Sequence, residues 1–200
     1  MYLGIAENID DVVEIKKSKF LTYLRIVQTE EDVETYLAEF REQHKKATHV
    51  CYAYRLQSPF REKVSDDGEP SGTAGIPMLD ILKKKNVTNV LAVVVRYFGG
   101  VKLGAGGLVR AYAGSVVEAL DKVSIVTWQT GHLYQLCCDF DNYSSIQNNI
   151  MSLGKIKKIE YLDKVYIDCY SSLSQSELQS RVDCVVEYLG DEDYKSDNEN

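Results

Sequence analysis

Short apolar segments in the first half of the chain predict strands. Residues 20–27 are rich in β-branched and aromatic side chains. Residues 89–98 form an almost continuous β-branched run, which is typical of a strand buried on both faces. Residues 49–56 alternate, with one face formed by Val50, Tyr52, Tyr54 and Leu56 and the other by His49, Cys51, Ala53 and Arg55. The mixed stretch 1–15 predicts one further strand.

Helical spacing separates these strands. Thr29 and Asp32 resemble a capping box, so the pattern that follows predicts a helix over about 30–46. Ser71 or Thr73 can cap a second helix over roughly 74–84. A third helix follows the glycine-rich stretch and runs to about residue 121. Residues 58–72 contain two prolines and two glycines, and they predict a long mobile loop.

A second set of elements begins after Lys122. The pattern predicts two strands, a helix capped by Asn142, two more strands, a short helix with a Ser174–Glu177 capping box, and a last strand at 184–188. The strands before and after the capped helix cover 124–130, 132–140, 155–162 and 164–170, and the helix covers 142–152. This β-α-β-β-α-β order is that of a ferredoxin-like sandwich. We therefore predict an α+β protein of two two-layer α/β sandwiches, with domains at 1–130 and 131–190 and an acidic flexible tail at 191–200.

Composition narrows the class of protein. The 200 residues are 44% hydrophobic, which is ordinary for a globular chain. The longest apolar run, Val90–Val95, is far shorter than the ~20 residues of a membrane-spanning helix. The beginning of the chain lacks the features of a secretory signal, and the five cysteines form no CxxC pair. These features predict a cytoplasmic protein with reduced thiols and no membrane partner.

The net charge of −7 is unevenly distributed. Residues 1–122 hold 17 Lys and Arg against 17 Asp and Glu, whereas residues 123–200 hold 6 against 13. The acidity therefore belongs to the second domain, and it does not argue against phosphate binding by the first.

Five glycines lie within nine residues between the strand at 89–98 and the next helix. Such a loop, followed by free helix-terminal amides, is suited to a phosphate group. The candidate phosphate- or nucleic-acid-binding residues are Arg96, Gly99, Gly100, Lys102, Gly104, Gly106, Gly107 and Arg110. The spacing is neither a Walker A motif nor GxGxxG. A tight turn that packs the strand against the helix is the alternative interpretation.

Residues 66–73 contain three carboxylates. Asp66, Asp67 and Glu69 could hold Mg²⁺, because hard cations prefer oxygen ligands, but a turn with a helix cap explains the same pattern. His49 and Cys51 share a strand face, yet side chains two apart on a strand are awkwardly placed for a nucleophilic pair.

Three segments together resemble the signature motifs of the YigZ/IMPACT family. They are residues 47–54 (ATHVCYAY), 65–77 (SDDGEPSGTAGIP) and 95–112 (VRYFGGVKLGAGGLVRAY), preceded by KSKF at 17–20. The resemblance covers about 18–122, and the remainder looks like the smaller C-terminal domain of the bacterial YigZ branch. Ile76 departs from the family pattern, in which many members carry a basic residue. The residues of the family-motif loop are His49, Asp66, Asp67, Glu69, Ser71 and Thr73.

The resemblance implies an N-terminal domain with the fold of ribosomal protein S5 domain 2, and a C-terminal domain similar to domain V of elongation factor G. Both of those relatives work on RNA or the ribosome, and the eukaryotic IMPACT branch acts in translational control under amino-acid starvation. Some relatives carry a proline-dipeptidase label, but the sequence shows no metal-binding arrangement that supports it.

The leading hypothesis is a non-enzymatic RNA- or ribosome-binding protein that acts in translation and needs no cofactor. One alternative is a Mg²⁺-dependent enzyme that acts on a small phosphorylated substrate through the glycine loop. Another is a regulatory module that binds a protein partner. The sequence leaves the oligomeric state open.

Overall fold

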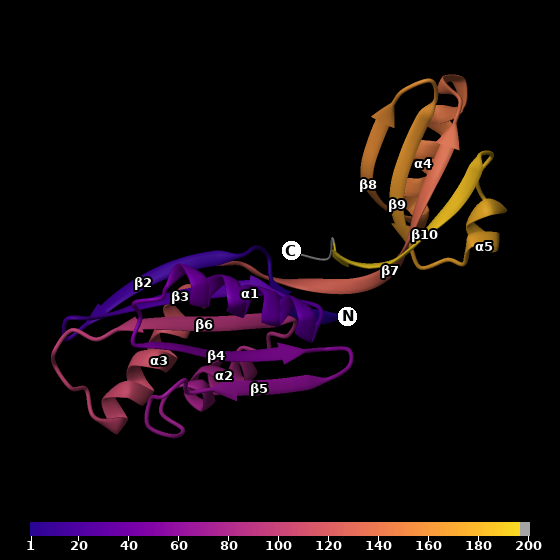
Figure 1. Ribbon diagram of the computed structural model, residues 1–200. Coiled ribbons are helices and arrows are strands. Elements are labelled where there is room, and N and C mark those ends of the chain that lie inside the picture. The colour runs from indigo at the N-terminus through magenta and orange to yellow at the C-terminus, as the bar shows by residue number, and fades with distance from the viewer. Residues whose placement is uncertain (197–200) are drawn as a thin grey trace. The chain divides into compact units, whose positions relative to one another are not determined.

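The computed structural model describes residues 1–196, which form two compact units (Figure 1). The division falls between Thr127 and Trp128, three residues before the boundary expected from the sequence. Within the described residues, no helix is long and apolar enough to cross a membrane.

The N-terminal unit is built on an antiparallel sheet with the order β2-β3-β6-β4-β5. Its strands are β2 (Ile9–Ile15), β3 (Ser18–Ile26), β4 (His49–Leu56), β5 (Arg61–Ser65) and β6 (Val90–Tyr97), and a short β1 (Tyr2–Ile5) precedes them. Its helices are α1 (Glu30–Gln43), α2 (Gly75–Lys84) and α3 (Ala105–Leu120). The capping box of Thr29 and Asp32 is present at the start of α1.

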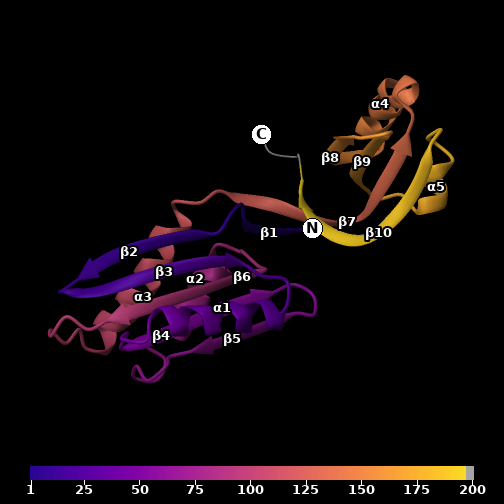
Figure 2. The same cartoon turned by 45° about the horizontal axis from the view of Figure 1, so that its top comes forward.

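Helices cover both faces of this sheet (Figures 1 and 2). Alternate residues of β6 enter two different cores, with Val94 packed among residues of α2 and α3 and Val93 packed among residues of α1. All six residues from Val90 to Val95 are fully buried, as expected for a strand between two layers. The mixed α/β class is therefore confirmed, and α1 adds a third layer to the expected two.

Two local expectations for this unit were wrong. The stretch 1–15 holds two strands, β1 and β2, rather than one. The expected mobile loop 58–72 contains β5, which pairs antiparallel with β4. β5 begins Arg61-Glu62-Lys63, and charged side chains of this kind are common on an edge strand, where one side faces water. Its pattern therefore resembles that of a loop.

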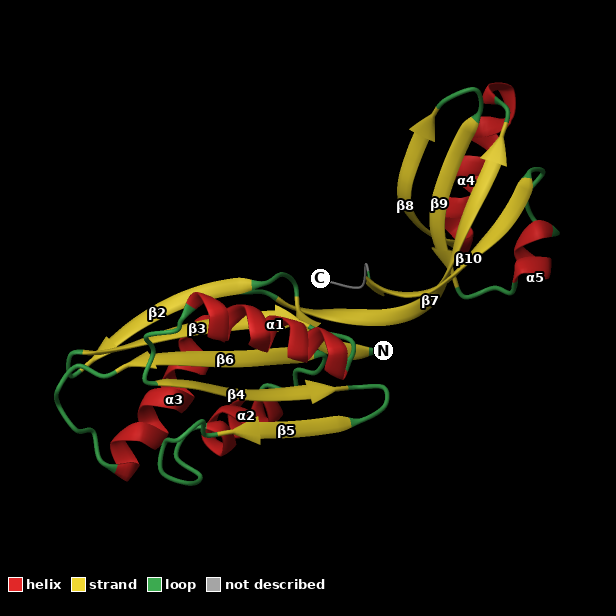
Figure 3. Ribbon diagram, in the orientation of Figure 1, coloured by secondary structure: helices red, strands yellow, loops and turns green. Residues whose placement is uncertain are grey.

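The C-terminal unit contains four antiparallel strands and two helices, and these strands belong to a five-stranded sheet that also includes β1. Its strands are β7 (Ile125–Cys138), β8 (Gly154–Tyr161), β9 (Val165–Ser171) and β10 (Val185–Lys195), in the order β10-β7-β9-β8. A 3-10 turn, η1 (Phe140–Asn142), leads into α4 (Tyr143–Leu153), and α5 (Gln175–Gln179) follows β9 (Figure 3). The order of strands and helices confirms the ferredoxin-like prediction, including the strand at 184–188 and the Ser174–Glu177 capping box.

Two expectations for this unit were wrong in detail. The separate strands at 124–130 and 132–140 are one strand, β7, because Gly131 continues the ladder opposite Glu192. Residues 191–195 of the expected tail belong to β10, where Asp191 pairs with His132. An acidic side chain on a solvent-exposed strand can face water or pair with a basic side chain, so acidic residues alone do not prevent a strand. Residues 197–200 of that tail lie outside the described part of the chain.

Asn142 occupies the expected cap position of α4 but makes no side-chain cap.

Candidate functional site

A pocket of about 310 Å³ lies where β4, β6 and α3 come together in the N-terminal unit. It unites residues from all three sequence motifs. The lining residues are Thr48, His49, Glu69, Pro70, Arg96, Phe98, Lys102, Leu103, Gly104, Ala105 and Leu108.

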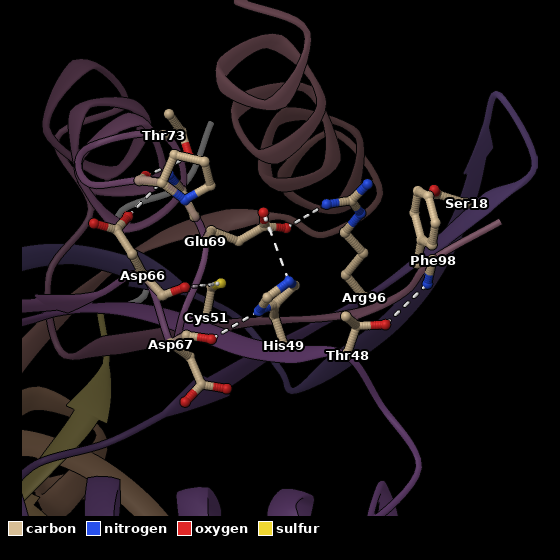
Figure 4. A network of polar contacts seen from close by, with 12 residues as sticks. Ser18, Thr48, His49, Cys51, Asp66, Asp67, Glu69, Thr73, Arg96 and Phe98 are labelled. Atoms are coloured by element: carbon tan, nitrogen blue, oxygen red, sulfur yellow. Dashed lines mark hydrogen bonds and ion pairs between the residues drawn. The ribbon is translucent and has the colours of Figure 1, made fainter. Parts of the chain in front are cut away.

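Glu69 is the central charged group of this pocket. Its side chain is only 3% exposed, and its Oε1 accepts hydrogen bonds from Arg96 Nη1 at 2.6 Å and from the Tyr112 hydroxyl at 2.8 Å. Its other oxygen, Oε2, lies 3.7 Å from His49 Nε2 (Figure 4). Among residues 1–196 no hydrogen bond to Oε2 is formed, so this oxygen can still accept one.

Arg96 is buried, whereas the sequence hypothesis makes it a phosphate contact. Its side chain is 6% exposed, and its guanidinium carbon lies 5.5 Å from the Phe20 ring centroid and 5.6 Å from that of Phe98. The charge of Arg96 is balanced by Glu69, and its Nε has no hydrogen-bond partner within the described residues. Arg96 therefore shapes the inside of the pocket, and it does not present a free charge to the surface.

Asp66 and Asp67 are occupied by the protein's own backbone. The Asp66 carboxylate accepts hydrogen bonds from the amides of Gly72, Ala74 and Gly75 at 2.8–3.0 Å. Burial raises the pKa of Asp66, but these hydrogen bonds prevail and leave its pKa below the usual value. The Asp67 carboxylate accepts the Val50 amide at 2.6 Å. Within the described residues, no group of three His, Cys, Asp or Glu side chains is arranged to hold a metal ion.

The expected caps of α2, Ser71 and Thr73, do not cap it. The N-cap position is Ala74, which has no capping side chain, and the Thr73 hydroxyl donates to the Pro70 carbonyl at 2.6 Å. Ser71 is exposed. Asp66 performs the capping role from a distance of eight residues, a spacing that local cap patterns do not include.

Cys51 is a buried thiol that supports the pocket from behind. Its Sγ donates to the Asp66 carbonyl at 3.0 Å and lies 3.4 Å from the Tyr112 hydroxyl. Burial raises the pKa of Cys51 to about 12, so the group is a thiol near neutral pH. This protonation state disfavours a Cys51–His49 nucleophilic pair.

The five glycines of the loop have different structural roles. A Cβ on Gly99 would lie 1.9 Å from the Lys17 carbonyl oxygen, so the close packing of the loop on the β2–β3 turn requires glycine. Gly100 and Gly104 have φ angles of +85° and +72°, which glycine adopts readily. Gly106 and Gly107 lie in the first turn of α3. The tight-turn interpretation therefore accounts for three of the five.

The N-terminus of α3 is open. Its first turn contains no acidic residue, its cap position is Gly104, and no hydrogen bond engages the amides of residues 105–107 in the part of the chain that the structure describes. Lys102 is exposed beside this end and lines the pocket. Arg110 is exposed too, but it lines a second hollow of about 200 Å³ together with Lys16. The positive candidates are thus divided between two hollows that share Leu103.

Sequence reasoning missed the apolar part of the pocket. Phe98, Leu103 and Leu108 line it, but in the sequence they resemble ordinary core or loop residues. The available signal was the position of Phe98, which follows a buried strand directly and precedes the glycine loop. Tyr112 was expected in the core, and it is buried there with its hydroxyl group on Glu69.

The segments that build this pocket lie within residues 16–120, which match the Impact N-terminal domain. The chain belongs to the IMPACT family. It is 39% identical over 171 residues to IMPACT family member YvyE of Bacillus subtilis (strain 168), covering 84% of this chain and 79% of that protein. It is 40% identical over 154 residues to IMPACT family member YigZ of Escherichia coli (strain K12), covering 75% of this chain and 76% of that protein. The resemblance inferred from the motifs is confirmed.

One solved structure, described as the crystal structure of an hypothetical protein, is similar over both units. The match has a TM-score of 0.65 and 33% sequence identity, and it covers 92% of this chain and 95% of that one. This IMPACT family chain therefore shares its fold, over most of its length, with a solved structure.

Proposed function

We propose that this IMPACT family protein binds RNA, free or in the ribosome, through the N-terminus of α3, and that it acts in translational regulation without catalysing a reaction. The open, uncapped first turn of α3 carries this proposal. Free amides at a helix N-terminus, combined with the helix dipole, attract anions. Lys102 adds a full positive charge beside them, and Glu69 does not cancel it because the Glu69 carboxylate is already paired with Arg96.

Family membership supports the translational part of the proposal. The eukaryotic branch that the motifs resemble acts in translational control, and residues 16–120 match the domain that carries those motifs. The neutral charge balance of residues 1–122 also leaves the N-terminal unit free to approach a polyanion. A protein partner in the same process and a cytoplasmic location stay predictions.

The proposal is tested by measuring the affinity for a short single-stranded RNA over a salt series. Phosphate contacts release counterions, so we expect the affinity to fall steeply as salt rises. Lys102→Ala should weaken binding. It should also reduce the slope of log affinity against log salt concentration by about 0.7, the value for one phosphate contact on a single strand. Lys84→Ala removes an equal charge from the exposed last turn of α2 and serves as the matched control.

An affinity that does not depend on salt concentration would overturn the proposed RNA site. So would an affinity that falls equally in Lys102→Ala and Lys84→Ala. Co-sedimentation with ribosomes, using the same two variants, tests whether the RNA is ribosomal. We expect wild type and Lys84→Ala to sediment with ribosomes and Lys102→Ala to be depleted from the pellet.

A further inference from the structure

The inner end of the pocket presents hydrogen-bond acceptors. His49 Nδ1 lies 2.8 Å from the Asp67 carbonyl oxygen, and a carbonyl only accepts, so Nδ1 carries the hydrogen. In a neutral ring Nε2 is then an acceptor. It faces Glu69 Oε2, a second acceptor, across 3.7 Å. Two acceptors at this separation suit a group that donates two hydrogen bonds, such as an amino group.

The walls between this end and the mouth are largely apolar. Phe98, Leu103 and Leu108 line the pocket, and Phe98 keeps 47% of its surface exposed. A volume of about 310 Å³ lies at the lower end of the range for small-molecule pockets, roughly 300–1,000 Å³. The pocket therefore has room for one largely apolar group of modest size.

Charge separates the mouth from the inner end. The α3 amides and Lys102 attract a phosphate at the mouth, whereas the Glu69–Arg96 pair at the inner end carries no net charge and offers no free cation to a phosphate. A ligand that satisfies both ends has an anionic part outside and a neutral, hydrogen-donating part inside.

We infer that the pocket takes the base of one unpaired nucleotide from the bound RNA, with an exocyclic amino group donating to Glu69 Oε2 and His49 Nε2. The base stacks on Phe98, and its backbone phosphate stays at the N-terminus of α3. This inference rests on the proposed RNA binding and adds the recognised group. It requires an unpaired nucleotide, because in a duplex the amino group is already engaged and the base is stacked.

The direct test compares two RNA oligonucleotides of equal length, one of cytidines and one of uridines. They carry the same charge, but cytosine has an amino group where uracil has a carbonyl oxygen. We expect the intact chain to bind the cytidine strand at least tenfold more tightly, because a single hydrogen bond to a charged acceptor is already worth about that factor. Equal affinities would overturn the inference.

Variants test whether the preference for cytidine over uridine arises in the pocket. Phe98→Ala should weaken binding of both strands by about tenfold or more through lost stacking. Phe60→Ala removes another exposed ring, at 59%, from outside the pocket and should leave both affinities unchanged. His49→Ala should reduce the preference for cytidine. Thermal unfolding of each variant verifies that it is folded.

The outcomes separate the inference from the proposed function. Salt-dependent binding that loses affinity in Lys102→Ala but treats cytidine and uridine alike would leave the RNA site standing and remove the base pocket. Absence of salt-dependent binding to either strand would remove both.

Discussion

At the scale of single residues, the pairing of Glu69 with Arg96 changes the chemistry that the sequence suggested. Each residue is a candidate in the sequence, Arg96 for phosphate and Glu69 for Mg²⁺. The fold places them 2.6 Å apart in a buried environment, where each charge requires the other. Their 27-residue separation gives no local signal of this contact.

Asp66 supplies a prediction at the same scale. Asp66→Ala removes the acceptor for three amides at the start of α2, so we expect a loss of about 1–2 kcal/mol in the free energy of unfolding near pH 7. Because the folded pKa of Asp66 is lowered, its contribution is complete above the unfolded pKa of about 3.9. The contribution disappears as pH falls through the lower folded value. Urea unfolding at several pH values measures the difference.

The control for this prediction is Asp80→Ala, which removes an exposed carboxylate from α2 itself. We expect this variant to change stability by at most a few tenths of a kcal/mol. If the difference between wild type and Asp66→Ala did not shrink as the pH was lowered below the unfolded pKa of about 3.9, the capping explanation would be wrong.

At the scale of elements, the N-terminus of α3 is unfavourable for helix stability but favourable for the proposed RNA binding. Its open N-terminus is unfavourable for the helix, since acidic side chains there usually complement the dipole. Ala105→Asp should therefore raise the free energy of unfolding by about 0.3–1 kcal/mol. The same carboxylate should weaken RNA binding, because it repels phosphate at the mouth of the pocket. Chemical unfolding and the RNA titration measure the two effects.

A matched change in another helix separates the two effects. α4 has no acidic residue in its first turn, and Ser144 is exposed there. Ser144→Asp should give a similar gain in stability with unchanged RNA affinity. An Ala105→Asp protein that binds RNA as wild type does would show that the α3 terminus is not the phosphate site.

Most elements were predictable because their side chains report burial directly. The capping boxes of α1 and α5 and the six-residue apolar run of β6 each have a local pattern. β5 and the second half of β10 were not predicted from the sequence, because charged residues on edge strands resemble those of loops. Their pairing is decided by β4 and β7, which lie far away in the sequence.

At the scale of the whole molecule, the two units have separate cores. Residues buried with α1, α2 and α3 form two clusters in the N-terminal unit, and a third cluster surrounds Ile167 in the C-terminal unit. Ile167→Ala should destabilise the C-terminal unit by about 2–5 kcal/mol through lost burial and a cavity. RNA affinity at low denaturant should stay as in wild type, because the proposed site lies wholly within residues 48–108.

Two measurements on the intact chain check this prediction. Unfolding followed by Trp128 fluorescence reports on the C-terminal unit, because Trp128 is the only tryptophan and lies in that unit. The RNA titration reports on the N-terminal one. A variant that is folded by fluorescence but has lost RNA affinity would contradict the assignment of the site to the N-terminal unit alone.

The sequence by itself determined the α+β class and the family, and it predicted a division near residue 130 and a glycine-rich loop as the candidate site. These features depend on periodicity, local caps and contiguous motifs, all of which are properties of neighbouring residues. The tertiary structure decided which charges are free. It buried Arg96 against Glu69, committed Asp66 to α2, left the amides of α3 open and assembled apolar walls around them. A charge is available to a ligand only if no closer partner neutralises it, and that partner is chosen by the fold.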